Sequence, residues 1–590
     1  MINNVRERNP MPEQPIEVRC DNFNEVALGY TEADAIREAM RCLNCRKKPC
    51  VAGCPINQQI PEFIAKVAVG DFAAAYDIIT VKSCMPSICG RVCPQEQQCE
   101  KNCAHALKGE AVGIGRLERF VADWYAARNP ISVPSVEKKG KKVAVIGSGP
   151  AGIACAGDLA AMGYDVTVFE KLSYAGGILT YGIPQFVLPN EVVDRHIDTL
   201  KAQGVEIVTS SPIDKSKSID ALFADGFEAV FVGNGADIPQ TPRGLDTSLE
   251  GVWSANDYLT EVNLNTAALP ASIKEAKRVL VVGGGNVAVD AVRCAKRVGA
   301  EPIMVYRRTI AEAPARRDEI EHTREESIEI KELTNPVECI GKDGKLVAVK
   351  LEKMTLGEPD ASGRRSPVGT GEYFEIECDN LVIATGTSYS EDVVDTTTGI
   401  DKDKWGGIAV DDGCMTSRPG VFAGGDAVTG PQVVVKAMGA GRCAAVSIDG
   451  EGVGFIGQIH PIVAKNYGID VEVYCAEISF TKLCGLMLPE ATYTPLPKYP
   501  SVTRDLSLIC DEAITVAQAE EVITASAGKL LRSVKLFDIY RGTGVPEGKK
   551  SMAFSLELRA DDRTLTDTDS EAVVAKVLDA LKEKLNAILR

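Results

Sequence analysis

Nine of the nineteen cysteines lie between Cys42 and Cys103, a density typical of metal sites. The spacing runs Cys42-x2-Cys45-x4-Cys50-x3-Cys54-Pro55, then Cys89-x3-Cys93-Pro94, Cys99 and Cys103. Runs that end in Cys-Pro predict two [4Fe–4S] clusters, with the last cysteine of one run serving the other cluster. Zinc is the alternative, but it would need two closed sets of four ligands with shorter, paired spacings.

The composition gives little support to other chemistry. The four histidines (His105, His196, His322 and His460) lie far apart in the sequence, which argues against zinc hydrolases and histidine-based triads. The net charge of −17 argues against a protein that coats nucleic acid or anionic membrane. Because no apolar run is long enough to span a bilayer and the N-terminus is polar, we expect no membrane attachment and a cytoplasmic location.

The first glycine fingerprint is Gly147-Ser-Gly149-Pro-Ala151-Gly152, which follows an expected strand, Lys142–Ile146, and opens an apolar helix. The three glycines allow a tight turn, close approach of a pyrophosphate and close packing of the helix on the strand. The helix N-terminus also favours an anion. A second strand, Asp165–Phe169, ends in Glu170, whose carboxylate would accept hydrogen bonds from a ribose diol and repel a 2′-phosphate. This site is predicted to hold an unphosphorylated adenosine ribose, as FAD has.

The second fingerprint, Gly283-Gly-Gly285-Asn286-Val287-Ala288, follows a strand expected at residues 279–282. Tyr306 stands at the position that corresponds to Glu170, and Arg307 and Arg308 come next. Two guanidinium groups without an acid suit a phosphate dianion, so the site is predicted to prefer NADP(H). Arginines after a strand are more often a solvated edge, but their place beside a complete fingerprint favours phosphate binding.

The elements around these motifs predict several domains. Residues 1–140 are expected to be helical, with cysteine-rich loops and a helix at Ile114–Arg128. From residue 141 to about 449, strands and helices alternate, which predicts an α/β architecture with two Rossmann-like dinucleotide-binding domains. Residues 497–590 predict an α+β ferredoxin-like domain. Its expected strands lie near residues 505–510, 533–540 and 551–558, and its expected helices at Val516–Ala527 and residues 570–589.

The two fingerprints resemble those of flavoproteins with two dinucleotide-binding domains, in which an NADPH domain interrupts the FAD domain. That resemblance implies an FAD domain in two parts, 141–275 and 391–449, around an NADPH domain at 276–390. Thr385-Gly386 and Gly425-Asp426 match the completing motifs, and the aspartate would bind the ribityl and pyrophosphate region of FAD. A helix at residues 432–445 would direct its N-terminus at the flavin ring. Val232-Gly233-Asn-Gly235 departs from the usual alanine–threonine–glycine turn, and the absence of Cys-x-x-Cys from the NADPH domain excludes a thioredoxin-reductase mechanism.

Residues 1–449 resemble more specifically the small subunit of bacterial glutamate synthase and its single-chain relatives. The relatives are homotetrameric NADPH glutamate synthase and the large subunit of NADH-dependent ferredoxin–NADP oxidoreductase. The motifs are Arg41-Cys-Leu-Asn-Cys45, Cys89-Gly-Arg-Val-Cys-Pro94, Ile114-Gly-Arg-Leu-Glu-Arg-Phe120 and Tyr181-Gly-Ile-Pro184. The resemblance assigns Cys42, Cys45, Cys50 and Cys103 to one cluster, and Cys54, Cys93, Cys99 and the Glu118 carboxylate to the other. It leaves Cys84 and Cys89 as packed thiols, and adds Lys171, Gly177, Leu179, Gly182 and Val433 to the cofactor-binding residues.

The resemblance implies that NADPH reduces FAD, and that electrons then pass singly through two [4Fe–4S] clusters to a partner protein. The acceptor would be a glutamate synthase large subunit or a ferredoxin-type protein, within a homo- or hetero-oligomer. No side chain need act as acid or base, since the cofactors do the chemistry. The alternative is the large subunit of a bifurcating ferredoxin–NADP oxidoreductase. Glutamate synthesis itself needs a glutaminase and an FMN barrel, and neither is seen in this sequence.

From about residue 450 the chain resembles the C-terminal end of the phenylalanyl-tRNA synthetase β subunit. Phe455-Ile-Gly-Gln-Ile-His-Pro461 and Ala464-Lys-Asn-Tyr-Gly468 match a remnant of its catalytic-like module, expected at 450–496. Pro497-Lys-Tyr-Pro500, Phe537-Asp-Ile-Tyr-Arg541 and Arg563-Thr-Leu-Thr-Asp567 match its ferredoxin-fold anticodon-binding domain. The resemblance implies tRNA contact through Arg541, Lys549 and Lys550, although residues 498–590 carry 14 basic and 15 acidic side chains.

Three hypotheses account for this C-terminal part. It is a passive appendage of a redox subunit, or a tRNA-binding module that tethers the redox half, or the product of two joined reading frames. The change of pattern within a few residues of Asp449 favours a joined or recently fused chain.

Overall fold

The computed structural model describes residues 5–266, 268–359, 365–390, 392–411, 413–448, 455–458, 474–477, 499, 501–512, 514–541, 545–546, 548–560, 563–585 and 587–589. The chain divides into two compact units, Met1–Leu486 and Met487–Arg590. Most of the expected remnant at 450–496, including the Ala464–Gly468 motif, lies outside the described residues. Its described part is an antiparallel pair, β16 (Phe455–Gln458) and β17 (Tyr474–Glu477).

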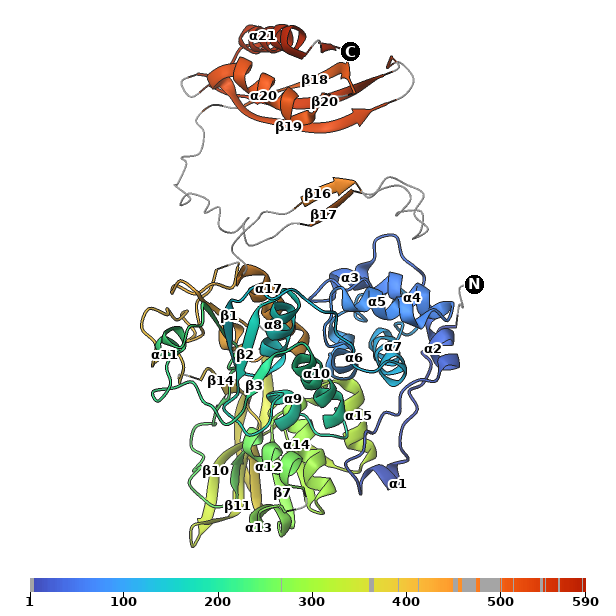
Figure 1. Ribbon diagram of the computed structural model, residues 1–590. Helices are drawn as coiled ribbons and strands as arrows, with labels where there is room; N and C mark the ends of the chain where they lie inside the picture. The colour runs from blue at the N-terminus through green and yellow to red at the C-terminus, as the bar shows by residue number, and fades with distance from the viewer. Residues whose placement is uncertain are drawn as a thin grey trace. The chain divides into compact units, whose positions relative to one another are not determined.

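The N-terminal part of the first unit is helical, as the sequence predicts (Figure 1). Its helices are α1 (Ile16–Arg19), α2 (Glu32–Ala39), α3 (Pro49–Ala52), α4 (Ile60–Ala68), α5 (Phe72–Thr80), α6 (Pro86–Val92) and α7 (Ile114–Arg128), with 3-10 turns η1 (Gln95–Gln97) and η2 (Ala104–Leu107). A capping box between Thr31 and Asp34 starts α2. Phe63 and Ile64 of α4 and Leu117 of α7 form its fully buried core. This bundle holds the loops that carry the clustered cysteines.

The first fingerprint belongs to a five-stranded parallel sheet in the order β15-β4-β1-β2-β3. The strands are β1 (Lys142–Ile146), β2 (Asp165–Phe169), β3 (Glu206–Val208), β4 (Ala229–Val232) and β15 (Val421–Ala423). Its helices are α8 (Pro150–Ala161), α9 (Ile178–Tyr181), α10 (Asn190–Ala202), α11 (Ile219–Ala224), α16 (Asp426–Thr429) and α17 (Val434–Ile448). Since β15 and α17 lie about 190 residues beyond β4, this domain is completed from the far side of the second one.

The second fingerprint belongs to another five-stranded parallel sheet, in the order β6-β13-β7-β8-β9. The strands are β6 (Val252–Ser254), β7 (Arg278–Val282), β8 (Glu301–Val305), β9 (Glu329–Lys331) and β13 (Asn380–Ile383). Its helices are α12 (Ala255–Asn265), α13 (Ala271–Lys274), α14 (Asn286–Arg297) and α15 (Arg317–Glu325), with the 3-10 turn η3 (Ile310–Glu312). The sheet therefore includes β6, which lies before residue 276, where the resemblance implied that the NADPH domain begins. A three-residue strand without a glycine motif gives no local signal of the sheet it joins.

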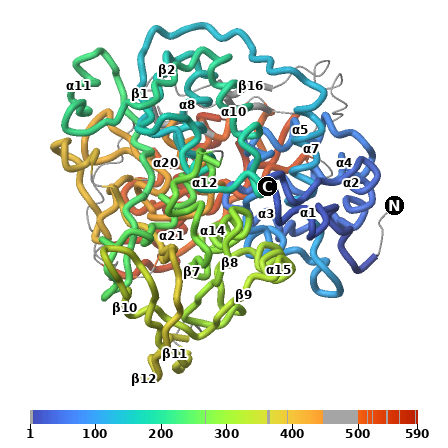
Figure 2. Tube along the Cα trace, turned by 90° about the horizontal axis from the view of Figure 1, so that it is seen from below, coloured from blue at the N-terminus to red at the C-terminus, as the bar shows by residue number. Residues whose placement is uncertain are grey.

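Two smaller sheets complete the first unit. The strands β10 (Thr334–Lys342), β11 (Lys345–Pro359) and β12 (Arg365–Glu377) form an antiparallel meander that projects at one edge (Figure 2). The short strands β5 (Ile238–Pro239) and β14 (Thr387–Ser388) pair where the chain passes between the two dinucleotide-binding domains.

The second unit is the predicted α+β fold. It comprises β18 (Val502–Asp511), α20 (Val516–Ala527), η4 (Gly528–Leu530), β19 (Leu531–Tyr540), β20 (Lys549–Leu558), α21 (Asp567–Leu585) and β21 (Ile588–Leu589). The antiparallel sheet has the order β19-β20-β18-β21, over a core that includes Phe554 and Val577. The helix expected at 570–589 was wrong at its end, because Ile588 and Leu589 pair with the edge of β18.

Across the described ranges, no helix is both long and apolar enough to cross a membrane.

Candidate cofactor-binding sites

Four cysteines line one cavity of the helical domain. Cys42, Cys45, Cys50 and Cys103 border it, together with Pro49, Ile60, Ile64 and His105 among others. All four thiols belong to partly exposed residues, so the cavity reaches the surface. Burial and the neighbouring thiols, Cys103 among them, raise the pKa of Cys42, and the same causes raise the pKa of Cys50 to about 11. Four converging soft ligands are the donor set that iron–sulfur clusters use, and these residues fit such a group.

The other proposed ligands gather deeper in the domain. Cys93 and Cys99 are each 8% exposed, and burial raises the pKa of Glu118, on α7, to about 8. Burial and then the Glu118 carboxylate raise the pKa of Cys54, and burial followed by the charges of Glu100, Cys54 and Glu118 raises that of Cys99. The structure therefore brings Cys54, Cys93, Cys99 and Glu118 together. A partly buried carboxylate with no cation beside it to lower its pKa fits the role of an oxygen ligand.

Cys89 lies beside this second group, although the resemblance leaves it out of the ligand set as a packed thiol. It is 1% exposed and hydrogen-bonds Cys93, which is the first cause of the raised pKa of Cys93. Cys89 also lies near enough to contribute to the raised pKa of Cys54. Its spacing of four positions before Cys93, on α6, is the signal that could have found it, because such residues share a helix face. Cys84 is partly exposed, and burial followed by the charges of Asp158 and Cys89 raises its pKa against the opposing effect of Arg442.

The first fingerprint leaves room for a ligand at one glycine. Gly147 has φ +93°, and a Cβ there would lie 2.5 Å from the Gly233 carbonyl oxygen. A Cβ on Gly152 would lie 1.9 Å from the Gly147 carbonyl oxygen, so neither position has room for a side chain. A Cβ on Gly149 would meet nothing within 4 Å. Gly177 packs on Gly149, and Ala151 is buried on α8. The open backbone at Gly149, at the start of α8, is where a pyrophosphate fits.

Glu170 is buried beneath this loop, and its two carboxylate oxygens already have partners. One accepts hydrogen bonds from Ser148 N at 3.0 Å and Ser148 Oγ at 2.5 Å, and the other from Leu172 N at 2.9 Å. A carboxylate has about four acceptor positions, so room for a ribose hydroxyl remains. Lys171 forms an ion pair with Asp237, while Leu179 is fully buried on α9 and Gly182 ends that helix.

The completing segment returns to the first fingerprint. A Cβ on Gly425 would lie 3.0 Å from Ala151 Cβ, and one on Gly441 of α17 would lie 2.0 Å from the Ala151 carbonyl oxygen. Asp426 accepts a hydrogen bond from Gln432 N at 3.1 Å, and burial raises its pKa to about 6. Val433 packs at the start of α17 against the core of the first domain. Thr385 and Gly386, after β13, contact Gln240 of the crossing between domains.

The second fingerprint has the same geometry. Gly283 has φ +151° and lies against the Ala384 carbonyl oxygen, and Ala288 packs on Gly283. A Cβ on Gly285 would have its nearest neighbour at 3.9 Å, so this glycine is open to a ligand. Asn286 accepts a hydrogen bond from Arg316 N at 2.9 Å, and Val287 is partly exposed on the first turn of α14.

The two arginines after β8 have different surroundings. Arg307 is exposed at the end of the strand, whereas Arg308 is 7% exposed and donates from Nε to the Arg365 carbonyl oxygen at 3.0 Å. Arg307 is therefore the guanidinium that is free to approach a phosphate, and Arg308 holds β12.

The deeper thiol group adjoins the first dinucleotide-binding domain. Cys89 and Cys93 belong to the same buried core as Ala151 of α8 and Met438 of α17. Ile56, two residues after Cys54, would contact a Cβ on Gly439 of α17 at 3.3 Å. Cys54 and Cys99 also pack on the core of the helical bundle, as do Cys42, Cys50 and Cys103. The Cys54 group thus lies between the first dinucleotide domain and the more exposed Cys42 group.

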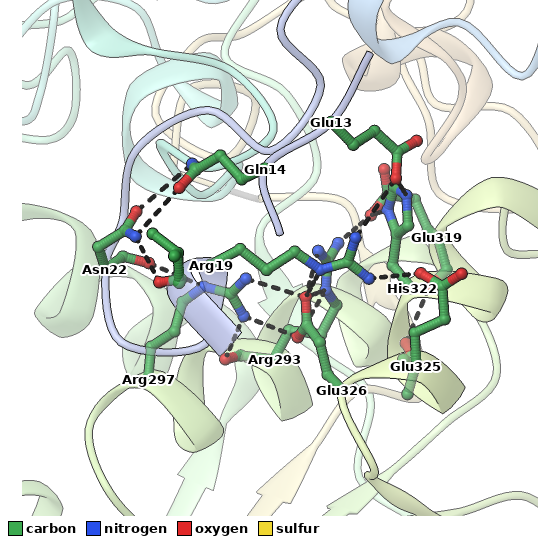
Figure 3. A network of polar contacts seen from close by, with 12 residues as sticks. Glu13, Gln14, Arg19, Asn22, Arg293, Arg297, Glu319, His322, Glu325 and Glu326 are labelled. Atoms are coloured by element: carbon green, nitrogen blue, oxygen red, sulfur yellow. Dashed lines mark hydrogen bonds and ion pairs between the residues drawn. The ribbon is translucent and has the colours of Figure 1, made fainter. Parts of the chain in front are cut away.

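A buried ionic network joins the N-terminal segment to the second dinucleotide domain (Figure 3). The Glu326 carboxylate accepts hydrogen bonds from Arg293 and Arg297 of α14 at 2.8 Å, and Arg19 of α1 lies 3.3 Å away. Glu13, His322 and Glu325 are close enough together to hold a metal ion, but Arg19 pairs with both of these carboxylates and already supplies a cation.

Two family models match the cysteine-rich and dinucleotide-binding parts of the chain. That for pyridine nucleotide-disulphide oxidoreductases matches residues 141–441, and that for dihydropyrimidine dehydrogenase domain II, 4Fe-4S cluster, matches residues 19–130. The glutamate synthase [NADPH] small chain of Escherichia coli (strain K12) is 34% identical over 457 residues, covering 74% of this chain and 95% of that protein. This chain belongs to the glutamate synthase small-subunit family.

Other members of the family are equally similar. The glutamate synthase [NADPH] small chain of Halomonas elongata is 35% identical over 453 residues, covering 75% of this chain and 94% of that protein. The NADP(+)-dependent formate dehydrogenase subunit beta of Moorella thermoacetica is 37% identical over 428 residues, covering 68% of this chain and 59% of that protein. As a glutamate synthase small-subunit homologue, the chain is an NADPH-dependent flavin oxidoreductase with FAD and iron–sulfur cofactors.

The C-terminal resemblance also has matches. The ferredoxin-fold anticodon binding domain model matches residues 497–590, and the phenylalanyl tRNA synthetase beta chain CLM domain model matches residues 423–480. Of the basic residues expected to meet tRNA, Arg541 pairs with Glu512, Lys549 lies 3.6 Å from Asp511 and Lys550 donates to the Glu512 carbonyl oxygen at 2.9 Å.

Proposed function

We propose that this chain passes electrons from NADPH to an acceptor protein through FAD and two iron–sulfur sites in a fixed order. The Cys54–Cys93–Cys99–Glu118 group receives them from the flavin domain, and the Cys42–Cys45–Cys50–Cys103 group delivers them to the partner. The observation that carries this order is the packing of Cys93 in the core that also contains Ala151 and Met438, while the other group borders a cavity that reaches the surface.

When bound, NADPH and FAD supply hydride transfer and the iron–sulfur groups supply one-electron storage. The chain's own residues position these groups. Gly149 and Gly285 open the backbone to the two pyrophosphates, Glu170 recognises an unphosphorylated ribose, and Arg307 recognises the 2′-phosphate of NADPH. Burial raises the pKa of Asp426 to about 6, so this carboxyl is still mostly ionised near neutral pH and presents hydrogen-bond acceptors near the flavin.

The partner is proposed from the names of the relatives, several of which are chains or subunits of larger oxidoreductases. A glutamate synthase large subunit or a ferredoxin-type protein would serve as acceptor, in a cytoplasmic homo- or hetero-oligomer. Whether the product includes glutamate then depends on that partner.

Anaerobic purification followed by iron, acid-labile sulfide and flavin analysis tests the proposal. About eight irons and one FAD per chain are expected for two [4Fe–4S] clusters. NADPH should bleach the flavin absorbance at a far lower concentration than NADH does. Zinc without sulfide, or a protein without flavin, would overturn the proposal.

The match of residues 497–590 to an anticodon-binding domain supports tRNA contact as a second function. Because Arg541, Lys549 and Lys550 are engaged by Glu512 and Asp511, we expect weak binding. Filter binding of tRNA to the full chain and to a chain ending at residue 448 measures the contribution, and equal retention by the two would exclude this function.

A further inference from the structure

Two segments, residues 43–48 and residues 101–108, each contribute side chains to the lining of the Cys42–Cys45–Cys50–Cys103 cavity. Leu43 and Cys45 of the first segment line the cavity, as do Cys103, Ala104 and His105 of the second. We call the exposed side chains of these two segments the basic rim.

The charge of the basic rim is opposite to that of the protein. It carries Arg46, Lys47, Lys48, Lys101 and Lys108, all exposed, and the two segments contain no acidic residue. Among the described residues, only Lys48 of these five forms an ion pair, with Glu62. The whole chain has a net charge of −17, so a cluster of five basic side chains without an acidic one differs in sign from the protein as a whole.

Two large apolar side chains stand among these cations. Leu107 is 86% exposed and Leu43 is 39% exposed. Protein interfaces commonly have an apolar centre surrounded by charged side chains. The charges increase the rate at which the partners meet, and the apolar contact stabilises the complex. Free nucleotide or small-anion binding does not need exposed leucines.

We propose that the basic rim docks an acidic electron-carrier protein over the Cys42 group. This proposal rests on the proposed function and adds the chemistry of the partner. The partner would present carboxylates to Arg46, Lys47, Lys101 and Lys108, and an apolar spot to Leu107. Docking there places the acceptor beside the more exposed of the two thiol groups. A nucleic acid is the competing anionic partner, but the strongly acidic surface elsewhere would repel a long polyanion.

The test measures binding of a purified acidic [2Fe–2S] ferredoxin to the cofactor-loaded full chain by anaerobic calorimetry. The rim variant is Lys47→Glu/Lys101→Glu/Lys108→Glu. The matched control is Lys215→Glu/Lys274→Glu/Lys342→Glu, which changes the net charge equally at exposed lysines outside the cavity lining. Lys342 ends β10, at the opposite end of the first unit from α3 (Figure 1). Iron, sulfide and flavin contents must match the parent in both variants.

The rim variant should weaken ferredoxin binding by at least about tenfold at low salt, and the control by less than about twofold. The parent's affinity should fall between about 20 and about 300 mM salt, and the rim variant's should barely change. A basic redox protein, cytochrome c, should show the reverse preference. Equal loss in both triple variants, or none in either, would overturn the proposal, as would a rim variant that loses binding to a tRNA probe and not to ferredoxin. Failure of NADPH to bleach the flavin would count against the proposed function alone, because binding is measured independently of turnover.

Discussion

Glu118 is a carboxylate on a helix, a position that usually faces solvent, yet it lies among three thiols. Burial raises its pKa to about 8, and no cation offsets that cost. Cys89 lies next to Cys93 in the same neighbourhood, so five potential ligands surround a site that needs four.

Single substitutions decide between these two residues. If Glu118 is the fourth ligand, Glu118→Ala should lower the iron content from about eight to about four per chain, and Cys89→Ser should leave it unchanged. Iron and sulfide analysis with electron paramagnetic resonance of the reduced protein gives the readout. Retained iron in Glu118→Ala with loss in Cys89→Ser would assign the ligand to Cys89.

Arg307 and Arg308 differ in exposure, and we expect the exposed Arg307 to determine the preference for NADPH over NADH. Arg307→Leu should raise KM for NADPH by about 10- to 100-fold, because a charged hydrogen bond to phosphate contributes about 1.5–3 kcal/mol. KM for NADH should change little. Steady-state kinetics with a dye acceptor checks this. Arg308→Leu is the control for the neighbouring position. It should lower thermal stability instead, because it removes the hydrogen bond from Arg308 Nε to the Arg365 carbonyl oxygen. A larger effect of Arg308→Leu on KM would reverse the two roles.

At the scale of elements, α1 is held to α14 and α15 by the network around Glu326. Arg293 and Arg297 also lie over the ring of Phe186, at 4.6 and 4.0 Å from its centroid. The N-terminal segment, the first dinucleotide domain and the second one therefore meet in a single buried cluster. Since Phe186 lies in the first domain and α14 begins at the second fingerprint, this cluster opposes rotation of one domain against the other.

The network predicts a pH dependence of stability. Burial by itself would lower the pKa of His322, but contacts with Glu13 and Glu319 prevail and raise it to about 9. This contribution is complete below about pH 6.5 and is lost as the pH rises through about 9. It amounts to at most about 3.5 kcal/mol, since a pKa difference of one corresponds to about 1.4 kcal/mol. Burial opposes a low pKa of Glu326 as well, but the arginines lower it to about 2, so its contribution is lost only in strong acid.

Thermal unfolding between about pH 6.5 and about pH 10 measures the effect. The parent should lose stability over this range, and His322→Gln should start lower and change less. His196 provides the control, because burial lowers its pKa to about 4 and it stays neutral throughout. An identical slope in His322→Gln would show that the histidine is uncharged in the folded protein.

The glycine fingerprints and the alternation of strands and helices were sufficient to predict two Rossmann-like domains, because each motif is local and its geometry is strict. The interruption of one domain by the other was implied by the resemblance to two-domain flavoproteins. Membership of β6 in the second sheet could not be predicted, since three residues carry no distinctive pattern. The thiol groupings followed from the resemblance to the family, and their placement together agrees with it. The engagement of Arg308 by Arg365 and of Glu326 by Arg19 depends on residues 57 and 307 positions away, which no sequence window contains.

At the scale of the whole chain, the two units have separate cores. The core of the second unit contains only residues from 502 to 587, and Phe554, Leu556 and Val577 at its centre are fully buried. Among the described residues, the buried apolar side chains of the first unit extend no further along the chain than Ala445 of α17. In this part of the chain each unit thus has a core made of its own side chains.

A chain ending at residue 448 should keep the melting transition of the first unit and its NADPH-dependent flavin bleaching. The reason is that neither thiol group nor either fingerprint takes a residue from beyond α17. Residues 497–590 made separately should unfold in one cooperative transition, as single small domains usually do. Calorimetry of both pieces and of the full chain checks this. Loss of flavin from the shortened chain would show that the C-terminal part supports the first unit.

The difference in exposure between the two thiol groups also sets an order of decay in air. Dioxygen and the peroxide that follows from it reach Cys42, Cys45, Cys50 and Cys103 at the surface before they reach the buried Cys93 and Cys99. A sample kept in air would thus lose the group that delivers electrons to the partner before it loses the group that receives them from the flavin domain. For a time the protein would still accept electrons from NADPH, and oxygen would be their remaining acceptor. The age of the sample would then determine whether it reduces a partner protein or reduces oxygen.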